Sequence, residues 1–136
     1  MTFQIHPRLA AGGFEIGVIG GCRLFLKDNA LFPWFILVPE VEGVEDLHQL
    51  DHEVYLTVML VQKRVCEFIT DYFRPEKLNL GCIGNQVRQL HLHLVGRSSG
   101  DPAWPGTVWA FTGKSQYEAA TREEILAAAR KFLDLG

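Results

Sequence analysis

The sequence has 136 residues, of which 48% are hydrophobic and 21% are charged, and its formal net charge is −3. These values predict one folded domain over residues 1–136 and exclude a disordered chain or a disulfide scaffold. Because Lys and Arg form no cluster, nucleic acid is not an expected partner, although a single basic pocket can still hold a small phosphorylated ligand.

The cysteines and the N-terminus indicate the compartment. Three cysteines, Cys22, Cys66 and Cys82, are an odd number and lie far apart, which predicts small buried thiols in a reducing compartment. The N-terminal segment lacks the basic start and apolar run of a signal peptide. No stretch approaches about 18 uninterrupted apolar residues. We therefore expect a cytoplasmic protein without a membrane partner.

The first third of the chain has the pattern of three strands. Alternating runs at 14–20 and 22–27 flank Gly20-Gly21, which favours a hairpin because glycine tolerates positive φ. The apolar run at 34–38 lies between two prolines and is typical of a buried strand. The residues 44–49 are compatible with a short helical turn. The chain is therefore expected to begin with three strands.

Helix and strand patterns then follow in turn. Apolar residues three and four apart form one stripe along 51–72, which predicts a long helix. Two further strands are expected at 77–83 and 88–95. A capping box of Thr121 and Glu124 predicts the start of a C-terminal helix. The fold class is therefore α+β, with a five-stranded antiparallel sheet, one long helix and a C-terminal helix.

The second of these later strands carries the residues that are most able to take part in binding or catalysis. Alternation places Gln89, His91 and His93 on one face and the intervening leucines on the other. Two imidazoles and an amide can donate hydrogen bonds to a phosphate group, and histidine can attack phosphorus. Spacing alone leaves two alternatives open. These are a half-exposed polar face and a His-x-His metal pair, which would need further ligands for zinc.

The surrounding segments resemble the histidine-triad (HIT) family. Residues 85–97, NQVRQLHLHLVGR, resemble the family signature, in which a turn precedes histidines that alternate with apolar residues. Residues 25–39 are similar to its Asp-containing loop and following strand, which ends in a proline. Residues 97–106 are similar to the Arg…Trp-Pro-Pro-Gly tail of the nucleoside phosphoramidase branch. The resemblance extends over roughly residues 13–110 and includes the order of the elements.

This resemblance implies a nucleotide hydrolase or transferase that acts at an α-phosphate. A family histidine attacks that phosphate, and water or another acceptor then resolves the nucleotidyl-histidine. The nucleophile position is His91, and His93 at the third triad position helps to hold the phosphate. Asp28 lies near the position that holds the ribose hydroxyls, and Asn85 and Gln86 lie near the bridging atom. Family members need no metal, and no cofactor is expected.

Two family histidines are replaced in this sequence. Gln89 stands at the first triad position, and Trp34 stands at a separate upstream position. Because glutamine cannot carry a proton at neutral pH, leaving groups that need protonation should react slowly. Trp34, Arg97 and Trp104 complete the expected substrate-binding set. The alternative function is a non-catalytic nucleotide- or phosphate-binding module, and a histidine-based metalloprotein is a third hypothesis.

The expected partners are a nucleotide or nucleotide conjugate and a second copy of the chain. Family members are typically homodimers, and the predicted helix at 51–72 and strand at 77–83 would form the contact across a two-fold axis. Trp104 and Trp109 are expected near a site of this chain or of the partner, because exposed tryptophans often mark interfaces. The alternative is that both tryptophans cover the chain's own core.

Overall fold

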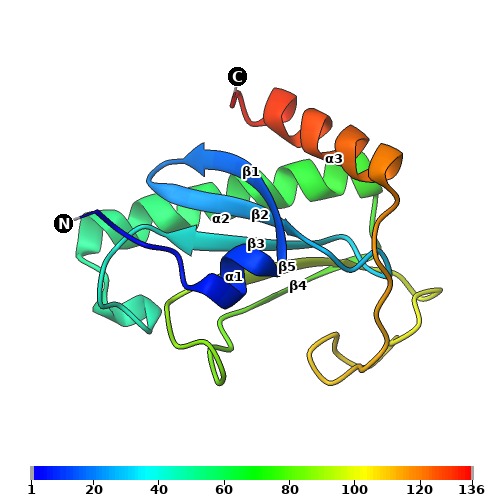
Figure 1. Cartoon of the computed structure of the whole chain (residues 1–136), viewed down its shortest axis with the longest axis horizontal. Helices are drawn as coiled ribbons and strands as arrows, with labels where there is room; N and C mark the ends of the chain where they lie inside the picture. The colour runs from blue at the N-terminus through cyan, green and yellow to red at the C-terminus, as the bar shows by residue number, and fades with distance from the viewer. Residues whose placement is uncertain (1, 136) are drawn as a thin grey trace.

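The computed structural model describes residues 2–135 and contains one five-stranded sheet (Figure 1). Neighbouring strands are all antiparallel, in the order β1-β2-β3-β5-β4. The predicted α+β class is therefore confirmed. The strands are β1 (Gly13–Ile19), β2 (Cys22–Lys27), β3 (Trp34–Pro39), β4 (Lys77–Gly81) and β5 (Leu92–Arg97), and the helices are α1 (Pro7–Ala11), η1 (Leu47–Gln49), α2 (His52–Phe73) and α3 (Ala119–Phe132).

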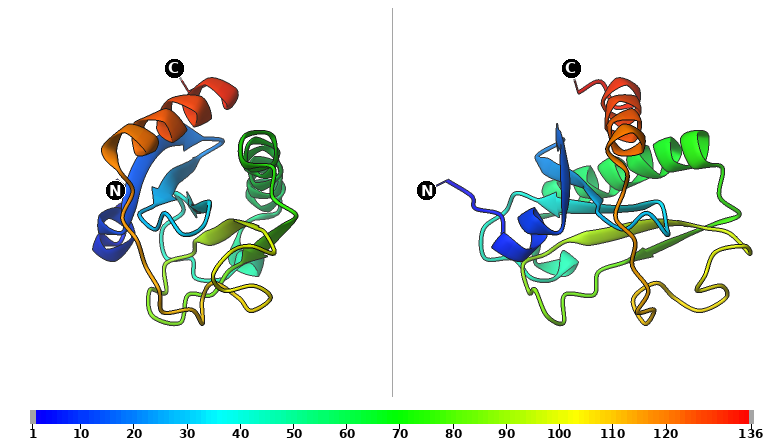
Figure 2. Two further views of the ribbon diagram at one scale, coloured as in Figure 1. Left: turned by 90° about the vertical axis from the view of Figure 1, so that its right-hand side faces the viewer. Right: turned by 45° about the vertical axis from the view of Figure 1, so that its right-hand side comes forward.

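The two long helices, α2 and α3, lie on the same side of the sheet (Figure 2). The apolar stripe predicted for α2 is buried there, with Val58, Val65 and Phe68 each 1% exposed or less. Ile125 and Ala129 of α3 join the same core. The opposite face carries a smaller apolar cluster, which the N-terminal segment and residues 103–111 partly cover. Within residues 2–135, no helix is long and apolar enough to cross a membrane.

The predicted glycine hairpin joins β1 and β2. Gly20 and Gly21 have φ values of 55° and 75°, in the region that L-residues rarely adopt. A Cβ on Gly20 would lie only 2.6 Å from Val61 Cγ2 of α2. The turn therefore needs glycine for its backbone conformation and, at Gly20, for its close approach to the long helix.

Strand β5 begins at Leu92, four residues later than predicted, so Gln89 and His91 precede the strand. In the observed register, Trp34 lies opposite Val95 and Leu37 opposite Leu92. Continued pairing would place Leu90 opposite Pro39, which has no amide hydrogen to donate. The Leu90 amide instead donates to the Val44 carbonyl at 3.0 Å. The alternation nevertheless continues through this segment, because Leu90, Leu92 and Leu94 are all buried in the main core.

Two smaller predictions need correction, and one short helix was not predicted. Helix α3 begins at Ala119, so Thr121 lies inside the helix and does not cap it. The preceding segment is already held in place, because the Tyr117 amide donates to Asp28 Oδ1 at 3.1 Å. Of the three cysteines predicted to be buried, Cys22 is buried, Cys66 is half-buried and Cys82 is exposed, since Cys82 follows the end of β4. The short helix α1 was not predicted; it begins with Pro7 at a position that favours proline.

Candidate active site

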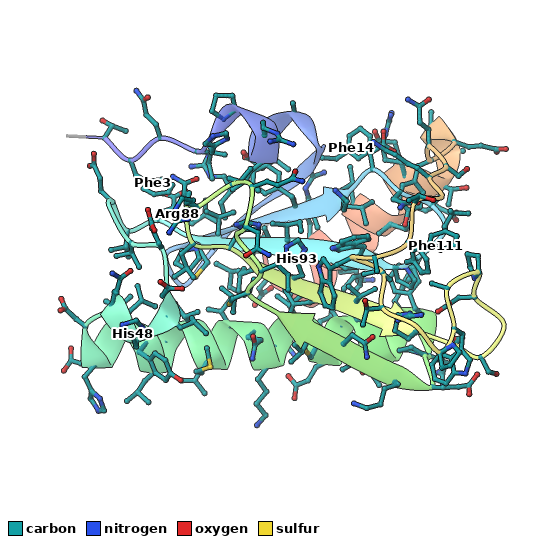
Figure 3. The ribbon with its side chains drawn as sticks, turned by 90° about the horizontal axis from the view of Figure 1, so that it is seen from below. Phe3, Phe14, His48, Arg88, His93 and Phe111 are labelled. Carbon is teal, nitrogen blue, oxygen red and sulfur yellow. The ribbon has the colours of Figure 1, made fainter. Side chains whose placement is uncertain are left out.

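A cavity of about 690 Å³ opens on the sheet face opposite to α2 and α3. In Figure 3 this face is seen from below, and His93 lies between the loop that carries Arg88 and the segment that carries Phe111. The walls come from the ends of β2, β3 and β5, from α1, and from the loops 83–87 and 107–114. His91 and His93 lie together in these walls. Strand β5 and the residue before it therefore present both predicted histidines to one open cavity.

The hydrogen bond of His91 determines which of its ring nitrogens carries a proton. His91 Nδ1 lies 2.7 Å from the Gln89 carbonyl oxygen. A carbonyl oxygen only accepts, so Nδ1 donates the hydrogen and Nε2 keeps a free lone pair in the neutral ring. Burial lowers the pKa of His91 and outweighs the Gln89 hydrogen bond, which acts in the opposite direction. At neutral pH, His91 is therefore a neutral imidazole whose Nε2 can act as a nucleophile.

His93 has the complementary arrangement. The indole Nε1 of Trp34 donates to His93 Nδ1 at 3.0 Å. An indole N–H only donates, so Nδ1 accepts and the neutral ring carries its hydrogen on Nε2. Burial lowers the pKa of His93 to about 3, and the charges of His91 and Lys27 act in the same direction. The two ring centroids are 4.9 Å apart. The pair therefore combines a nucleophilic nitrogen with a hydrogen-bond donor.

Trp34 is thus a structural neighbour of the histidines as well as a wall of the cavity. Its ring meets Trp109 edge-on at 6.4 Å between centroids, and Trp109 in turn meets His93 at 5.6 Å. Trp109 Nε1 is buried and has no hydrogen-bond partner among the described residues. A buried donor without an acceptor costs free energy, so this wall favours a ligand that can accept a hydrogen bond.

Gln89 does not join the two imidazoles in the main cavity. Its Oε1 accepts from the His6 amide at 2.9 Å, and its Nε2 donates to the Gln4 carbonyl at 2.9 Å. The side chain therefore holds the N-terminal segment against the residues that immediately precede β5. Of the expected row of three polar side chains, the two imidazoles lie at the cavity, whereas the amide of Gln89 is bound to the N-terminal segment.

The remaining predicted site residues separate into two groups. Trp34, Asn85 and Gln86 line the cavity, and Gln86 Oε1 accepts from Arg8 at 3.1 Å across its rim. Asp28 lies outside the lining, where its Oδ1 holds the segment before α3. Its contact with a ribose stays a prediction.

Arg97 and Trp104 also lie outside the lining, and they form a unit of their own. Arg97 is 2% exposed and makes a two-pronged ion pair with Asp101 at 2.8 and 3.0 Å. Asn79 Oδ1 accepts a further hydrogen bond from Arg97 at 2.9 Å. The half-exposed Trp104 ring lies 5.8 Å from the Arg97 guanidinium carbon. This arrangement holds the loop after β5, and the hydrogen bond and charge of Arg97 lower the pKa of Asp101 to about 2.

Three cationic side chains at the cavity were missed from the sequence. They are Arg8, Lys27 and Lys114. Lys27 could have been found from alternation in β2, because it lies two residues from Phe25, which faces the same cavity. Nothing local identifies Arg8 or Lys114, which belong to segments without a regular period. Within residues 2–135, no group of three His, Cys, Asp or Glu side chains is placed to hold a metal ion.

Two neutral imidazoles at a cavity with a cationic lining form an arrangement that can offer hydrogen bonds and positive charge to an anionic group. The sequence model of the HIT domain matches residues 16–100, and the chain belongs to the HIT family. A histidine triad protein from Bradyrhizobium japonicum is 28% identical, with a TM-score of 0.95 and coverage of 98% of this chain and 99% of that one.

Two further comparisons show the range of the likeness. A histidine triad protein from Marinobacter aquaeolei is 33% identical, with a TM-score of 0.94 and coverage of 99% of this chain and 98% of that one. A diadenosine triphosphate hydrolase from Plasmodium falciparum shares the fold at 14% identity, with a TM-score of 0.62 and coverage of 96% and 78%. No curated protein matches the sequence significantly.

Proposed function

We propose that this protein is a nucleotide hydrolase or transferase that forms a covalent nucleotidyl intermediate on His91. The observation that carries the proposal is the 2.7 Å hydrogen bond from His91 Nδ1 to the Gln89 carbonyl oxygen, which leaves Nε2 unprotonated at the cavity. Family membership and the likeness in fold to a diadenosine triphosphate hydrolase favour the same reaction class.

The reaction has two displacement steps at phosphorus. His91 Nε2 attacks the α-phosphorus, a P–N bond forms, and the bond to the leaving group breaks with its electron pair. The His93 Nε2 hydrogen donates to a non-bridging oxygen on which charge develops. Water, or another acceptor, then attacks the same phosphorus, and the P–N bond breaks with its electron pair returning to His91 Nε2. The proton of the attacking group passes to solvent, and a mononucleotide or its conjugate is released. Positioning, electrostatic stabilisation and the covalent intermediate each lower the barrier.

A non-catalytic nucleotide- or phosphate-binding module is the second candidate, and the position of Gln89 favours it. Both polar atoms of that side chain are held by the N-terminal segment, and an amide cannot protonate a leaving group. The two candidates agree on the phosphate position and differ in turnover. Reactions whose leaving group departs as a stable anion therefore give the most sensitive test for catalysis.

The decisive experiment is a turnover screen with purified protein. Adenosine and guanosine phosphoramidates, sulfates and dinucleoside polyphosphates are assayed for release of a mononucleotide. We expect release from at least one class, an adduct on His91 in mass spectra of quenched protein, and loss of both in His91→Ala. His48→Ala, which changes an exposed histidine, is the control. If His91→Ala keeps wild-type turnover on every active substrate, the proposed mechanism is wrong; if no substrate turns over, the binding module is favoured.

The same cavity should bind a nucleoside monophosphate through His93. A hydrogen bond to a charged phosphate is worth about 1.5–3 kcal/mol, so His93→Ala should weaken binding by roughly tenfold or more. Isothermal titration calorimetry with AMP and GMP measures this loss. Unchanged affinity in His93→Ala would show that the imidazole does not contact the phosphate.

We further propose that the protein is a homodimer. Strand β4 is an edge of the sheet and exposes Leu80, while the outer face of α2 exposes Leu56 and Leu60 at 48% and 67%. An unpaired strand beside apolar side chains favours pairing with another copy. Sedimentation at micromolar concentration should give a dimer mass, which Leu60→Glu should reduce. A monomeric wild type would contradict the proposal.

A further inference from the structure

The side chain of Gln89 makes two hydrogen bonds to the main chain near the N-terminus. Its Oε1 accepts from the His6 amide and its Nε2 donates to the Gln4 carbonyl, both at 2.9 Å. A primary amide offers acceptor and donor in one plane, so it can pair with a main chain as a neighbouring peptide group does. Because β5 begins only at Leu92, this amide supplies main-chain pairing at a point where the sheet supplies none.

The N-terminal segment, residues 3–11, is itself fixed by other contacts. Phe3 and Ile5 pack against the smaller apolar cluster, on the cavity face of the sheet. His6 Nδ1 accepts from the Arg8 amide at 3.1 Å and so caps α1. A side chain that is bonded to this segment is therefore held by a firm support.

The main chain of Gln89 receives the hydrogen bond of His91. The Gln89 carbonyl oxygen lies 2.7 Å from His91 Nδ1. The peptide group that carries this oxygen also carries the Leu90 amide, which donates to the Val44 carbonyl at 3.0 Å. Leu90 is 3% exposed, so the core holds one side of this peptide, and the Gln89 side chain holds the other. The direction of the carbonyl, and with it the ring of His91, depends on both supports.

We propose that Gln89 is a positioning residue for His91, through which the N-terminal segment keeps the nucleophile in its reactive tautomer. The inference rests on the proposed function and deepens it by assigning a role to position 89. With both sides of the peptide held, the carbonyl stays aligned with Nδ1–H, and Nε2 keeps its lone pair at the cavity. Without the Gln89 side chain, the carbonyl can turn away. The imidazole hydrogen can then move to Nε2, which no longer has a lone pair for attack on phosphorus.

The two hydrogen bonds explain why the residue at position 89 is a glutamine. They need one acceptor and one donor that point to the same stretch of main chain. Glutamate supplies only the acceptor, and a neutral imidazole carries its donor and acceptor on nitrogens that diverge. An amide cannot carry a proton in the reaction, so the contribution of Gln89 is orientation.

Nuclear magnetic resonance of isotopically labelled protein tests the proposal without a substrate. Long-range proton–nitrogen spectra, recorded at about pH 8 where ordinary histidines are neutral, show which ring nitrogen carries the hydrogen. We expect the Nδ1–H tautomer of His91 to predominate in wild type. Gln89→Ala should lower the ratio of Nδ1–H to Nε2–H at least about fivefold, as expected when one hydrogen bond is lost. Gln89→Glu keeps the acceptor and should have a smaller effect, and Gln4→Ala, which keeps the main-chain carbonyl, should have none.

A second pair of variants removes the contact from the other side and leaves Gln89 intact. His6→Pro removes the amide hydrogen that Gln89 Oε1 accepts, and the φ of −55° at His6 lies in the range that proline adopts. His6→Ala keeps this amide and removes only the imidazole that caps α1. The tautomer ratio of His91 should be at least about twofold lower in His6→Pro than in His6→Ala. Far-UV circular dichroism checks that each variant is folded, and the His6 pair decides the outcome if Gln89→Ala is not.

Turnover supplies a readout that a purely structural role would not move. On a substrate that wild type cleaves, Gln89→Ala should lower kcat at least about tenfold. Its affinity for AMP should stay within about twofold of wild type, because the substitution leaves His93 at the cavity unchanged. A tautomer shift with unchanged kcat would overturn the positioning role.

The remaining outcomes separate this inference from the proposed function. An unchanged tautomer ratio in Gln89→Ala, or equal ratios in the two His6 variants, would mean that Gln89 only fastens the N-terminal segment, and the inference would be wrong. If the ratio shifts but wild type cleaves no substrate, the positioning of His91 stands and the proposed function fails. If wild-type His91 carries its hydrogen on Nε2, both fail together.

Discussion

The low pKa of His93 predicts a pH-dependent loss of stability that can be measured without a substrate. Burial lowers this pKa from 6.5 to about 3, so the folded protein keeps His93 neutral at a pH where the unfolded chain binds a proton. The unfolded state then binds more protons than the folded state. The contribution is fully present above about pH 6.5 and is lost progressively as the pH falls toward 3.

The magnitude follows from the two pKa values. One pKa unit corresponds to about 1.4 kcal/mol, and the unfolded-state histidine is almost fully protonated at pH 5. Between pH 7.5 and pH 5, His93 should therefore lower the free energy of unfolding by about 2 kcal/mol. His93→Gln removes the titrating group and keeps an acceptor for the Trp34 indole.

Urea denaturation followed by far-UV circular dichroism measures the effect across this pH range. The difference in unfolding free energy between wild type and His93→Gln should change by about 2 kcal/mol from pH 7.5 to pH 5. His48→Gln, at an exposed position, should show little of this change. A difference between wild type and His93→Gln that stays constant with pH would refute the reasoning, because it would mean that His93 titrates alike in both states.

Three other substitutions test the supports of the site. Asp101→Ala should lower the free energy of unfolding by about 3–5 kcal/mol, because it leaves the buried Arg97 charge unpaired. Glu67→Ala, which removes an exposed ion pair, should cost under about 1 kcal/mol. Equal losses of the two variants in thermal unfolding would contradict this expectation. Gln89→Ala should speed amide hydrogen exchange around His6, since the His6 amide donates to Gln89 Oε1, which the substitution removes. Unchanged exchange would show that other contacts hold the N-terminal segment. Gly20→Ala should lower the free energy of unfolding by at least about 1 kcal/mol more than Gly21→Ala. The reason is that a Cβ on Gly20 meets Val61, while a Cβ on Gly21 meets nothing within 4 Å. Similar denaturation midpoints of the two variants would exclude that steric cost.

Local patterns in the sequence predicted the elements and the face of the site. Alternation along 90–94 buries the leucines in the main core and turns His91 and His93 to the other face, because the side-chain period of an extended chain is two. The stripe along α2 depends in the same way on the helical period. Both features need only neighbouring residues, which is why they can be derived without the fold.

The resemblance to the HIT family added chemical roles to those positions, and its two departures became interpretable only in three dimensions. Trp34 stands where the family has a histidine and donates to His93, which lies 59 residues further along the chain. Gln89 stands at the first triad position and holds the main chain of Gln4 and His6. Restoring a histidine at position 89 would therefore also remove two contacts of the N-terminal segment.

By itself, the sequence determined the α+β class, the hairpin at Gly20-Gly21 and the pairing of two histidines on one face. Only the tertiary structure decided the tautomer of His93, through the Trp34 indole, and the engagement of Gln89 by the N-terminal segment. The physical reason is the range of the interactions. Backbone periodicity acts over a few residues, whereas these hydrogen bonds join groups that only packing brings together, 59 to 85 residues apart in the chain.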